Sequence, residues 1–156
     1  MKLYFFRHGD AEPGTREDFN RRLTARGITR TRAAGQALIR MEVQPTHLFS
    51  SPRIRARETA DILAEALGVP VLVDSALDMD FHVDGLLRLI TGLDIDAEVL
   101  MVGHEPGLST VIGAVTGARV NMKKGGLARV ELYSLAPPTG ELDWVLVPRM
   151  FDLLAG

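Results

Sequence analysis

Four short runs of apolar, β-prone residues, each followed by a polar turn and a helix-like pattern, constrain this fold most. The first run, from Leu3 to Phe6, is apolar at every position, which is typical of a strand buried on both faces of a parallel sheet. Strands that alternate with helices in this way predict a mostly parallel sheet with helices on both faces. The predicted strands cover residues 3–6, 47–50, 69–73 and 98–102.

The predicted helices have recognisable ends. Thr24 is predicted to cap the first helix through its hydroxyl oxygen. Ser51 is predicted to cap the second, with Pro52 at the first helical position, where its missing N–H costs nothing. Gly68 is predicted to end that helix. The predicted helices cover about residues 24–41, 51–67, 84–93 and a segment that begins near residue 107.

The C-terminal part of the chain has a different pattern. Residues 126–135 and 142–147 alternate between apolar and polar positions, and Pro137-Pro138-Thr139-Gly140 lies between them, which predicts a hairpin at one sheet edge. The whole chain, residues 1–156, has the length of one domain. The predicted fold class is therefore α/β: a three-layer α/β/α sandwich with a mostly parallel central sheet and an antiparallel edge hairpin.

Several classes of protein are excluded by what the sequence lacks. The chain has no cysteine, so it holds no disulfide framework, no Cys-bearing zinc site and no thiol nucleophile. Its longest apolar runs are far shorter than the roughly 18 residues of a membrane span, and no signal-peptide core follows Lys2. A cytoplasmic protein without a membrane partner is therefore expected.

Charge is distributed unevenly along the chain. Residues 1–57 hold 12 of the 18 Lys and Arg but only 5 of the 20 Asp and Glu. This basic part is expected to face an anionic group. Nucleic acid is not the expected partner, because aromatic residues do not interleave the arginines. For the Arg-rich segment 16–40 and for the pair Lys123-Lys124 we favour a solvated face, with substrate contact as the alternative.

Two histidines and two arginines follow the ends of three predicted strands. Arg7 and His8 end the first strand, Arg55 lies in the opening turn of the helix after the second, and His104 follows the fourth. Ligands of open α/β sheets bind beyond the carboxyl ends of the strands, near helix N-termini. An imidazole nucleophile, together with arginine forks that hold phosphoryl oxygens, is the chemistry of phosphoryl transfer without cysteine or metal.

These residues lie in segments that resemble the motifs of the histidine phosphatase superfamily, also called the phosphoglycerate mutase-like family. By its size and the details of these motifs, the chain resembles in particular the SixA-type phosphohistidine phosphatase branch. The matching segments are Arg7-His8-Gly9, residues 21–27 (RRLTARG), residues 50–60 (SSPRIRARETA) and residues 102–106 (VGHEP).

The resemblance implies a role for each matching residue. His8 would be the nucleophile that becomes phosphorylated, Arg7 and Arg55 would bind the phosphate, and His104 would complete the pocket. Two further residues of the matching segments, Arg21 and Glu105, are predicted to contact substrate. The resemblance implies neither a metal nor an organic cofactor.

The proton donor is the least defined part of the predicted site. Larger members of the family carry a glutamate in a segment after the third strand. The corresponding stretch here, residues 77–82, offers Asp78 and Asp80 as candidate donors, with His82 as a further possibility.

The sequence therefore predicts a metal-independent phosphatase that acts through a phosphohistidine enzyme intermediate. The favoured substrate is protein phosphohistidine, so the expected partner is a phosphorylated protein. The alternative is a phosphomonoesterase or sugar-phosphate phosphatase that takes a small phosphorylated substrate on the same fold. A module that binds a phosphorylated ligand without turnover is disfavoured, because both His8 and His104 are present.

Overall fold

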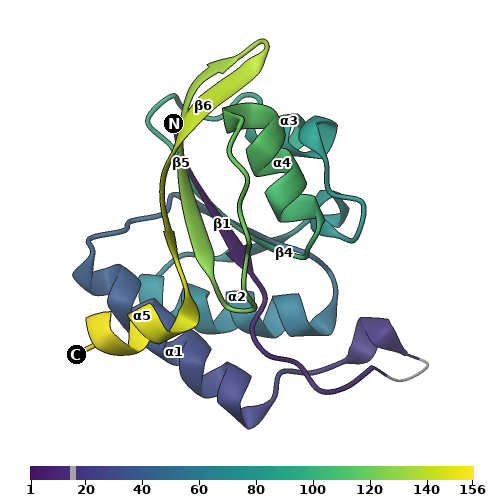
Figure 1. Ribbon diagram of the computed structural model, residues 1–156, viewed down its shortest axis with the longest axis vertical. Coiled ribbons are helices and arrows are strands. Elements are labelled where there is room, and N and C mark those ends of the chain that lie inside the picture. The colour runs from purple at the N-terminus through teal and green to yellow at the C-terminus, as the bar shows by residue number, and fades with distance from the viewer. Residues whose placement is uncertain (15–16) are drawn as a thin grey trace.

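The computed structural model describes residues 1–14 and 17–156, and Figure 1 shows how they are arranged. Arg16, the first residue of the Arg-rich segment, lies outside the described residues. The described chain contains a single six-stranded sheet with helices on both faces. Its strands are β1 (Lys2–Arg7), β2 (His47–Ser50), β3 (Val71–Val73), β4 (Glu98–Gly103), β5 (Leu127–Leu135) and β6 (Pro138–Leu146).

The strand order of the sheet is β3-β2-β4-β1-β5-β6. The first four strands of this order are parallel, whereas β5 is antiparallel to β1 and β6 is antiparallel to β5. The predicted fold class, a mostly parallel α/β sheet with an antiparallel edge hairpin, is therefore confirmed.

The register of the parallel strands brings the predicted site residues to one level. Arg7 of β1 lies opposite Gly103 of β4, and β2 ends one residue earlier on the other side of β4. His8 and His104, the residues that follow these strand ends, therefore lie next to each other at the carboxyl edge of the sheet.

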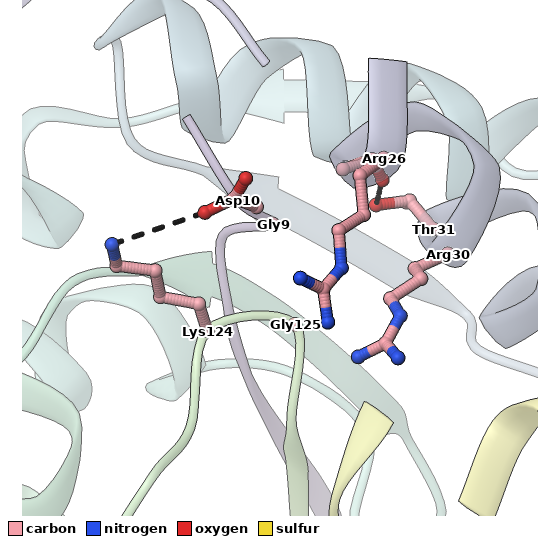
Figure 2. A pocket seen from close by; sticks show the side chains of 8 residues that line it. Gly9, Asp10, Arg26, Arg30, Thr31, Lys124 and Gly125 are labelled. Carbon is pink, nitrogen blue, oxygen red and sulfur yellow. Dashed lines mark hydrogen bonds and ion pairs between the residues drawn. The ribbon is translucent and has the colours of Figure 1, made fainter. Parts of the chain in front are cut away.

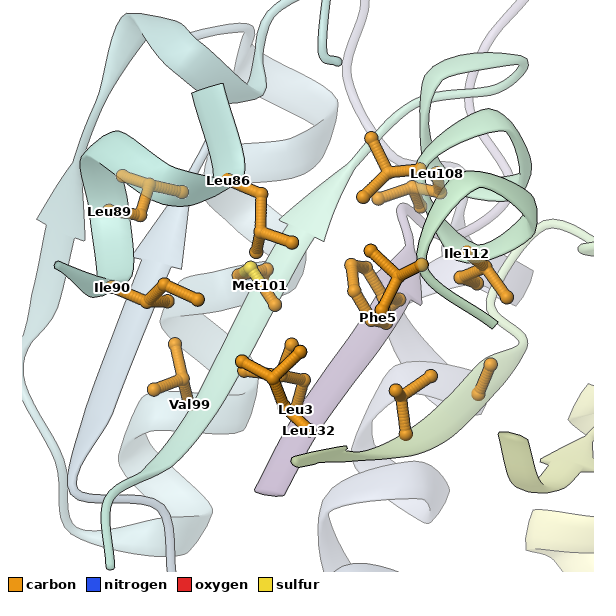
Figure 3. Close-up of a cluster of buried hydrophobic side chains, with 14 of the residues drawn as sticks. Leu3, Phe5, Leu86, Leu89, Ile90, Val99, Met101, Leu108, Ile112 and Leu132 are labelled. Carbon is orange, nitrogen blue, oxygen red and sulfur yellow. The ribbon is translucent and has the colours of Figure 1, made fainter. Parts of the chain in front are cut away.

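Alternate residues of each strand point to opposite faces of the sheet, and different helices cover the two faces. Leu3 and Phe5 of β1 pack with α3 and α4 on one face (Figure 3). Tyr4 and Phe6 pack with α1, α2 and α5 on the other. The helices are α1 (Ala25–Arg40), α2 (Ile54–Leu67), α3 (Val83–Ile90), α4 (Gly107–Thr116) and α5 (Pro148–Leu154), and η1 (Asp18–Asn20) and η2 (Ser75–Leu77) are short 3-10 turns.

The N-terminus of α1 lies close to the chain that follows β1. Thr24 caps α1 as predicted, because its hydroxyl oxygen accepts a hydrogen bond from the Gly27 N–H. A side chain at position 27 has no room, since a Cβ there would lie 2.2 Å from the Asp10 carbonyl oxygen. Gly27 therefore allows the first turn of α1 to pack directly against the segment that follows the His8 motif.

The prediction that Ser51 caps the second helix is wrong. Helix α2 begins at Ile54, its N-cap residue is Arg53, and no side chain caps it. The Ser51 hydroxyl oxygen does accept a hydrogen bond from the Arg53 N–H, at 3.2 Å, but it also contacts the His104 ring. The residues from Ser51 to Arg53 thus form a turn that connects the strand end to the helix and positions Ser51 in the site.

The starts of two strands and one whole helix also differ from the predictions. Strand β3 begins after Pro70, which has no N–H to donate within a sheet. Strand β6 begins earlier than predicted, so that the hairpin turns at residues 136–137. Helix α5 was not predicted; it carries proline at its start and packs Phe151 on Phe6 with ring centroids 6.2 Å apart.

Among the described residues, none of the helices is both long enough and apolar enough to cross a membrane.

Candidate active site

Side chains from three strand ends meet at the carboxyl edge of the sheet. His8, Arg55 and His104 are only 5%, 2% and 3% exposed. The rings of the two histidines lie 5.2 Å apart between centroids and are tilted by 54°. The structure therefore brings together the residues that the sequence predicted as nucleophile, phosphate ligand and second histidine.

The imidazole of His8 is fixed by one contact at each ring nitrogen. Nδ1 lies 2.7 Å from the Gly9 carbonyl oxygen, and the Arg55 Nε–H donates to Nε2 at 3.3 Å. A guanidinium can only donate and a carbonyl can only accept, so the proton of the neutral ring is on Nδ1 and the lone pair is on Nε2. Burial, with smaller effects from His104 and the arginines, lowers the pKa of His8 to about 3. At neutral pH His8 therefore presents an unprotonated nitrogen toward Arg55.

The backbone around His8 is held by neighbouring strands and by α2. The His8 N–H donates to the Gly103 carbonyl at 3.1 Å. The Gly9 N–H donates to the Thr59 hydroxyl at 3.1 Å, and this hydroxyl in turn donates to the Arg55 carbonyl at 2.8 Å. No role is predicted for Thr59 from the sequence. The signal that could have found it is a hydroxyl on the buried face of α2, one turn after Arg55.

His104 contacts Ser51 and has one unused ring nitrogen. Its Nε2 lies 2.7 Å from the Ser51 hydroxyl, and its Nδ1 is buried without a hydrogen-bond partner among the described residues. Because the Ser51 oxygen already accepts from the Arg53 N–H, its own proton can be donated to Nε2. In this arrangement Nδ1 carries the ring proton and can donate to a ligand. Burial and, to a smaller extent, the charge of Arg55 lower the pKa of His104 to about 4, while Asp78 acts in the opposite direction.

Arg7 is held by the loop before β5. Its Nη1 donates to the Met122 carbonyl oxygen at 2.8 Å, and its Nε is buried without a partner among the described residues. Burial lowers the pKa of Arg7, whereas the charge of Glu105 acts in the opposite direction. An arginine keeps its charge in proteins, so the unpartnered Nε–H is a donor available for an anion.

The Arg55 guanidinium is bound to η1 as well as to His8. Its Nη1 donates to the Asp18 carbonyl at 2.9 Å, and its Nη2 lies 3.4 Å from the Asp18 carboxylate. Arg53 and Arg21 bind the same carboxylate at 2.7 and 2.9 Å. Burial raises the pKa of Asp18, but these three arginines together lower it more. Asp18 lies in η1, a turn of three residues that no periodic pattern in the sequence indicates.

The candidate proton donors lie in different surroundings. The Asp78 carboxylate accepts from Arg53 Nε at 2.5 Å and from the Met79 N–H at 2.8 Å. Burial raises the pKa of Asp78, but these hydrogen bonds and the Arg53 charge lower it more. Asp80 is exposed and lines a hollow with His82 rather than with His8 and His104. His82 is also exposed, and its Nδ1 lies 2.6 Å from the Asp80 carbonyl.

The two further predicted contact residues take part in local structure. Arg21 binds the Asp18 carboxylate and donates to the Glu12 carbonyl at 3.0 Å, which stabilises the segment around η1. The Glu105 carboxylate accepts from the Ser109 N–H at 2.8 Å, at the start of α4. Contact of either side chain with a substrate stays a prediction.

The sequence comparisons decide the family. The model of the histidine phosphatase superfamily (branch 1) matches residues 3–84, more than half of the chain. The chain belongs to the histidine phosphatase superfamily. A curated relative from Picosynechococcus sp., which is named as an uncharacterised protein, is 37% identical over 136 residues, or 81% of this chain and 82% of the relative. The predicted family and the predicted enzyme class, a phosphatase, are thus confirmed.

Solved structures of two named phosphatases share the fold. The protein histidine phosphatase SixA, solved with tungstate, matches 96% of this chain and 99% of its own, with a TM-score of 0.87 and 23% identity. A mycobacterial glucosyl-3-phosphoglycerate phosphatase matches 92% of this chain and 97% of its own, with a TM-score of 0.71 and 18% identity. The fold is thus that of SixA-type enzymes, as the sequence predicted, and phosphatases named for different substrates share it.

Histidine phosphatase chemistry was predicted to need no metal here. Among residues 1–14 and 17–156, no three His, Asp or Glu side chains are grouped so that they could hold a metal ion. Metal independence stays a prediction, which a chelator can test directly.

Proposed function

We propose that this histidine phosphatase hydrolyses protein phosphohistidine without a metal, through a phosphohistidine intermediate on His8. The observation that carries the proposal is the pair of contacts that fixes the His8 ring, with Nδ1–H on the Gly9 carbonyl and Nε2 facing the Arg55 Nε–H. A neutral, oriented imidazole is the state in which histidine acts as a nucleophile.

In the first step the substrate phosphoryl group binds between Arg7, Arg55 and His104. The unpartnered Arg7 Nε–H and His104 Nδ1 are the donors available for its oxygens, together with the Arg55 fork. His8 Nε2 attacks phosphorus while the substrate ring is protonated on its other nitrogen. The bond from phosphorus to the leaving nitrogen breaks, this nitrogen keeps the electron pair, and the substrate ring leaves as neutral imidazole. The ring of phosphorylated His8 then carries a positive charge, which the Gly9 carbonyl oxygen at Nδ1–H stabilises.

In the second step water attacks the phosphorus of the intermediate. The oxygen–phosphorus bond forms, the bond from phosphorus to His8 Nε2 breaks, and inorganic phosphate is released as H2PO4⁻, which carries both protons of the water. The electron pair returns to Nε2, which restores the neutral ring with its proton on Nδ1. The same arginines hold the phosphoryl oxygens in both steps, so no group has to move between them.

The surroundings of the carboxylates support a nitrogen leaving group. An alkyl phosphate expels an alkoxide, and a general acid typically accelerates such a step by about 10²–10⁴-fold. Asp78 is bound to Arg53 and its pKa is lowered, so the carboxyl group is mostly ionised and rarely carries the proton that a general acid must donate. Phosphohistidine expels an imidazole whose conjugate acid has a pKa of about 6.5, and it leaves without a strong acid.

The two named neighbours support different substrates. SixA is named for protein phosphohistidine, and its bound tungstate is an oxyanion. The mycobacterial enzyme is named for a sugar phosphate, glucosyl-3-phosphoglycerate. A sugar-phosphate phosphatase is therefore the second candidate, and it requires an acid that the Asp78 and Asp80 surroundings do not favour.

A substrate panel in excess EDTA tests the proposal. We expect kcat/KM for a phosphohistidine peptide to exceed that for phosphoserine or sugar phosphates by at least about 10²-fold, the lower end of the contribution of a general acid. Activity should be the same with and without EDTA. Efficient hydrolysis of a sugar phosphate, or recovery of lost activity by Mg²⁺ or Zn²⁺, would contradict it.

A further inference from the structure

A basic hollow lies beside the His8 motif and takes no part in the chemistry proposed above. Figure 2 shows it between the N-terminal half of α1 and the loop before β5, with the guanidinium groups of Arg26 and Arg30 extending from the helix. Its volume is about 170 Å³. Lys124 lies across the hollow from these arginines, and Asp10 is the one acidic residue in its lining.

A second hollow continues the first. It has a volume of about 480 Å³ and shares Arg30 and Lys124 with the first hollow. Lys123 and Arg149 add two more positive charges to its lining. Here the term basic surface means the five side chains of the two hollows, Arg26, Arg30, Lys123, Lys124 and Arg149.

The charges of the basic surface are almost unneutralised. Within the part of the chain that the structure describes, Lys124 is its one member with an ion pair, at 4.0 Å from Asp10. The basic residues around η1 and α2 differ, because Arg21, Arg53 and Arg57 each bind a carboxylate at 3.2 Å or less. Repulsion between unpaired like charges costs stability unless an anion binds there.

Backbone hydrogen bonds connect the loop that carries Lys123 and Lys124 to the segment around His8. The Gly125 N–H lies 3.0 Å from the Arg7 carbonyl and 2.9 Å from the His8 carbonyl. Gly9, the residue after His8, and Gly125 both line the first hollow. A ligand in that hollow would therefore contact the residue next to the nucleophile.

We propose that the basic surface binds an acidic, Asp- and Glu-rich surface of the phosphoprotein substrate. This inference rests on the proposed function, because it assigns the protein partner of the same site. The positive charge of the basic surface favours an anionic partner. The spread of five cations over two adjoining hollows fits several carboxylates of a protein surface better than one small anion. The basic surface would accelerate association with the acidic substrate through electrostatic steering. It would therefore lower KM without changing the chemical step.

The test compares three substrates with the double variant Arg30→Ala/Lys124→Ala. The substrates are a phosphohistidine peptide flanked by aspartates, the same peptide with every aspartate replaced by asparagine, and phosphoramidate. We expect the variant to raise KM for the acidic peptide at least about fivefold, which corresponds to two exposed ion pairs of ordinary strength. Its kcat on this peptide, and its kinetics on the other two substrates, should equal those of the wild type.

The matched control is Arg32→Ala/Arg40→Ala, which removes two exposed cations of α1 outside the basic surface. It should leave all three substrates unaffected. An equal rise in KM for the acidic and the asparagine peptide, or a loss of activity on phosphoramidate, would overturn the inference.

A binding measurement separates this inference from the proposed function. Fluorescence anisotropy with a labelled Asp-rich peptide that lacks phosphohistidine needs no turnover. If no phosphohistidine substrate is hydrolysed but the variant binds this peptide at least about fivefold more weakly, the proposed function fails and the docking surface stands. Equal binding by variant and wild type, or tighter binding of an oligonucleotide of the same length, overturns the docking surface.

Discussion

The two sides of the active site are built differently. On the strand-end side, His8, Arg55 and His104 are almost completely buried, and both ring nitrogens of His8 are fixed by contacts. On the opposite side, Asp18 and Asp78 are partly exposed, and both carboxylates are bound by arginines. The proposed nucleophile and phosphate ligands therefore lie on the buried side, whereas the carboxyl groups of Asp18 and Asp78 on the ionic side are held in ion pairs and are not ready to donate a proton.

This difference has a chemical consequence. Burial keeps the two histidines neutral, since it penalises the charged ring, and a neutral ring can attack phosphorus. Ion pairs keep Asp18 and Asp78 ionised, since an arginine favours the carboxylate form. Under the proposed function, such a site would depend on the substrate for a good leaving group. Each prediction below changes one of the two sides.

The largest effect is expected from His8→Ala, which removes the nucleophile of the buried side. Turnover of phosphohistidine should be abolished, because no other group can form the covalent intermediate. Rapid-quench experiments with labelled substrate should find an acid-labile, base-stable phosphate on the wild type and none on the variant. Residual activity within about tenfold of the wild type, or an acid-stable phosphate on Ser50 or Ser51, would show that the nucleophile is another residue.

Arg55→Lys should lower kcat/KM by about 10²–10³-fold, the usual cost of one donor to transition-state charge. The lysine keeps the charge but loses the planar fork, and it has no Nε–H to hold His8. Steady-state kinetics on phosphohistidine would measure the loss. Arg57→Lys is the matched control, because Arg57 lies on the same helix, is exposed and pairs with Asp61. An active Arg55→Lys enzyme would show that fork geometry is unimportant.

The buried side was largely predictable from sequence, for a physical reason. Parallel strands end at one edge of a sheet, so residues placed directly after β1, β2 and β4 are expected at that edge. They meet because β4 lies between β2 and β1 in the sheet. His8 and His104 follow from this rule, and Arg55 follows from its place in the first turn of α2. The strand order itself was not predicted, because it depends on contacts between segments far apart in the chain.

The ionic side and the supporting hydroxyl groups were not predictable in the same way. Asp18 reaches Arg55 from a turn whose path no periodic pattern specifies. Ser51 has the sequence of a helix cap, but its hydroxyl contacts His104, a residue 53 positions away. Thr59 bonds to Gly9 across 50 positions. A local pattern shows that a polar group needs a partner, and only the tertiary structure shows which partner it finds.

Ser51→Ala should lower kcat/KM about tenfold, a smaller effect than that of Arg55→Lys. Without the hydroxyl, nothing keeps the ring proton of His104 on Nδ1, and the donor to the phosphoryl group is lost in part of the molecules. Steady-state kinetics and the ¹⁵N chemical shifts of His104 would measure activity and tautomer together. Ser50→Ala is the control, because the Ser50 hydroxyl bonds to the Ser51 carbonyl rather than to a catalytic side chain. An unchanged tautomer with full activity would exclude a positioning role.

Stability should fall in mild acid because both buried histidines have lowered pKa values, about 3 for His8 and about 4 for His104. The unfolded chain binds protons below pH 6.5 while the folded chain does not, so acid favours unfolding. Each histidine should remove about 2 kcal/mol of unfolding free energy between pH 8 and pH 5. Urea titrations at both pH values should give His8→Asn a smaller loss than the wild type. Equal losses would show that His8 is not buried in its neutral form.

The smallest effect is expected from Asp78→Asn on the ionic side. Asp78 holds Arg53 but is ionised, so its loss should change kcat/KM for phosphohistidine by less than about threefold, as for an exposed ion pair. On any alkyl phosphate that is turned over, the loss should be larger if Asp78 donates the proton that an alkoxide needs.

Asp80→Asn is the companion variant, since Asp80 lies in a separate hollow and should matter on neither substrate. The ratio of the two substrates in each variant is the measurement. A sugar phosphate that is cleaved efficiently by the wild type and not by one of these variants would identify the acid and place the enzyme among small-molecule phosphatases.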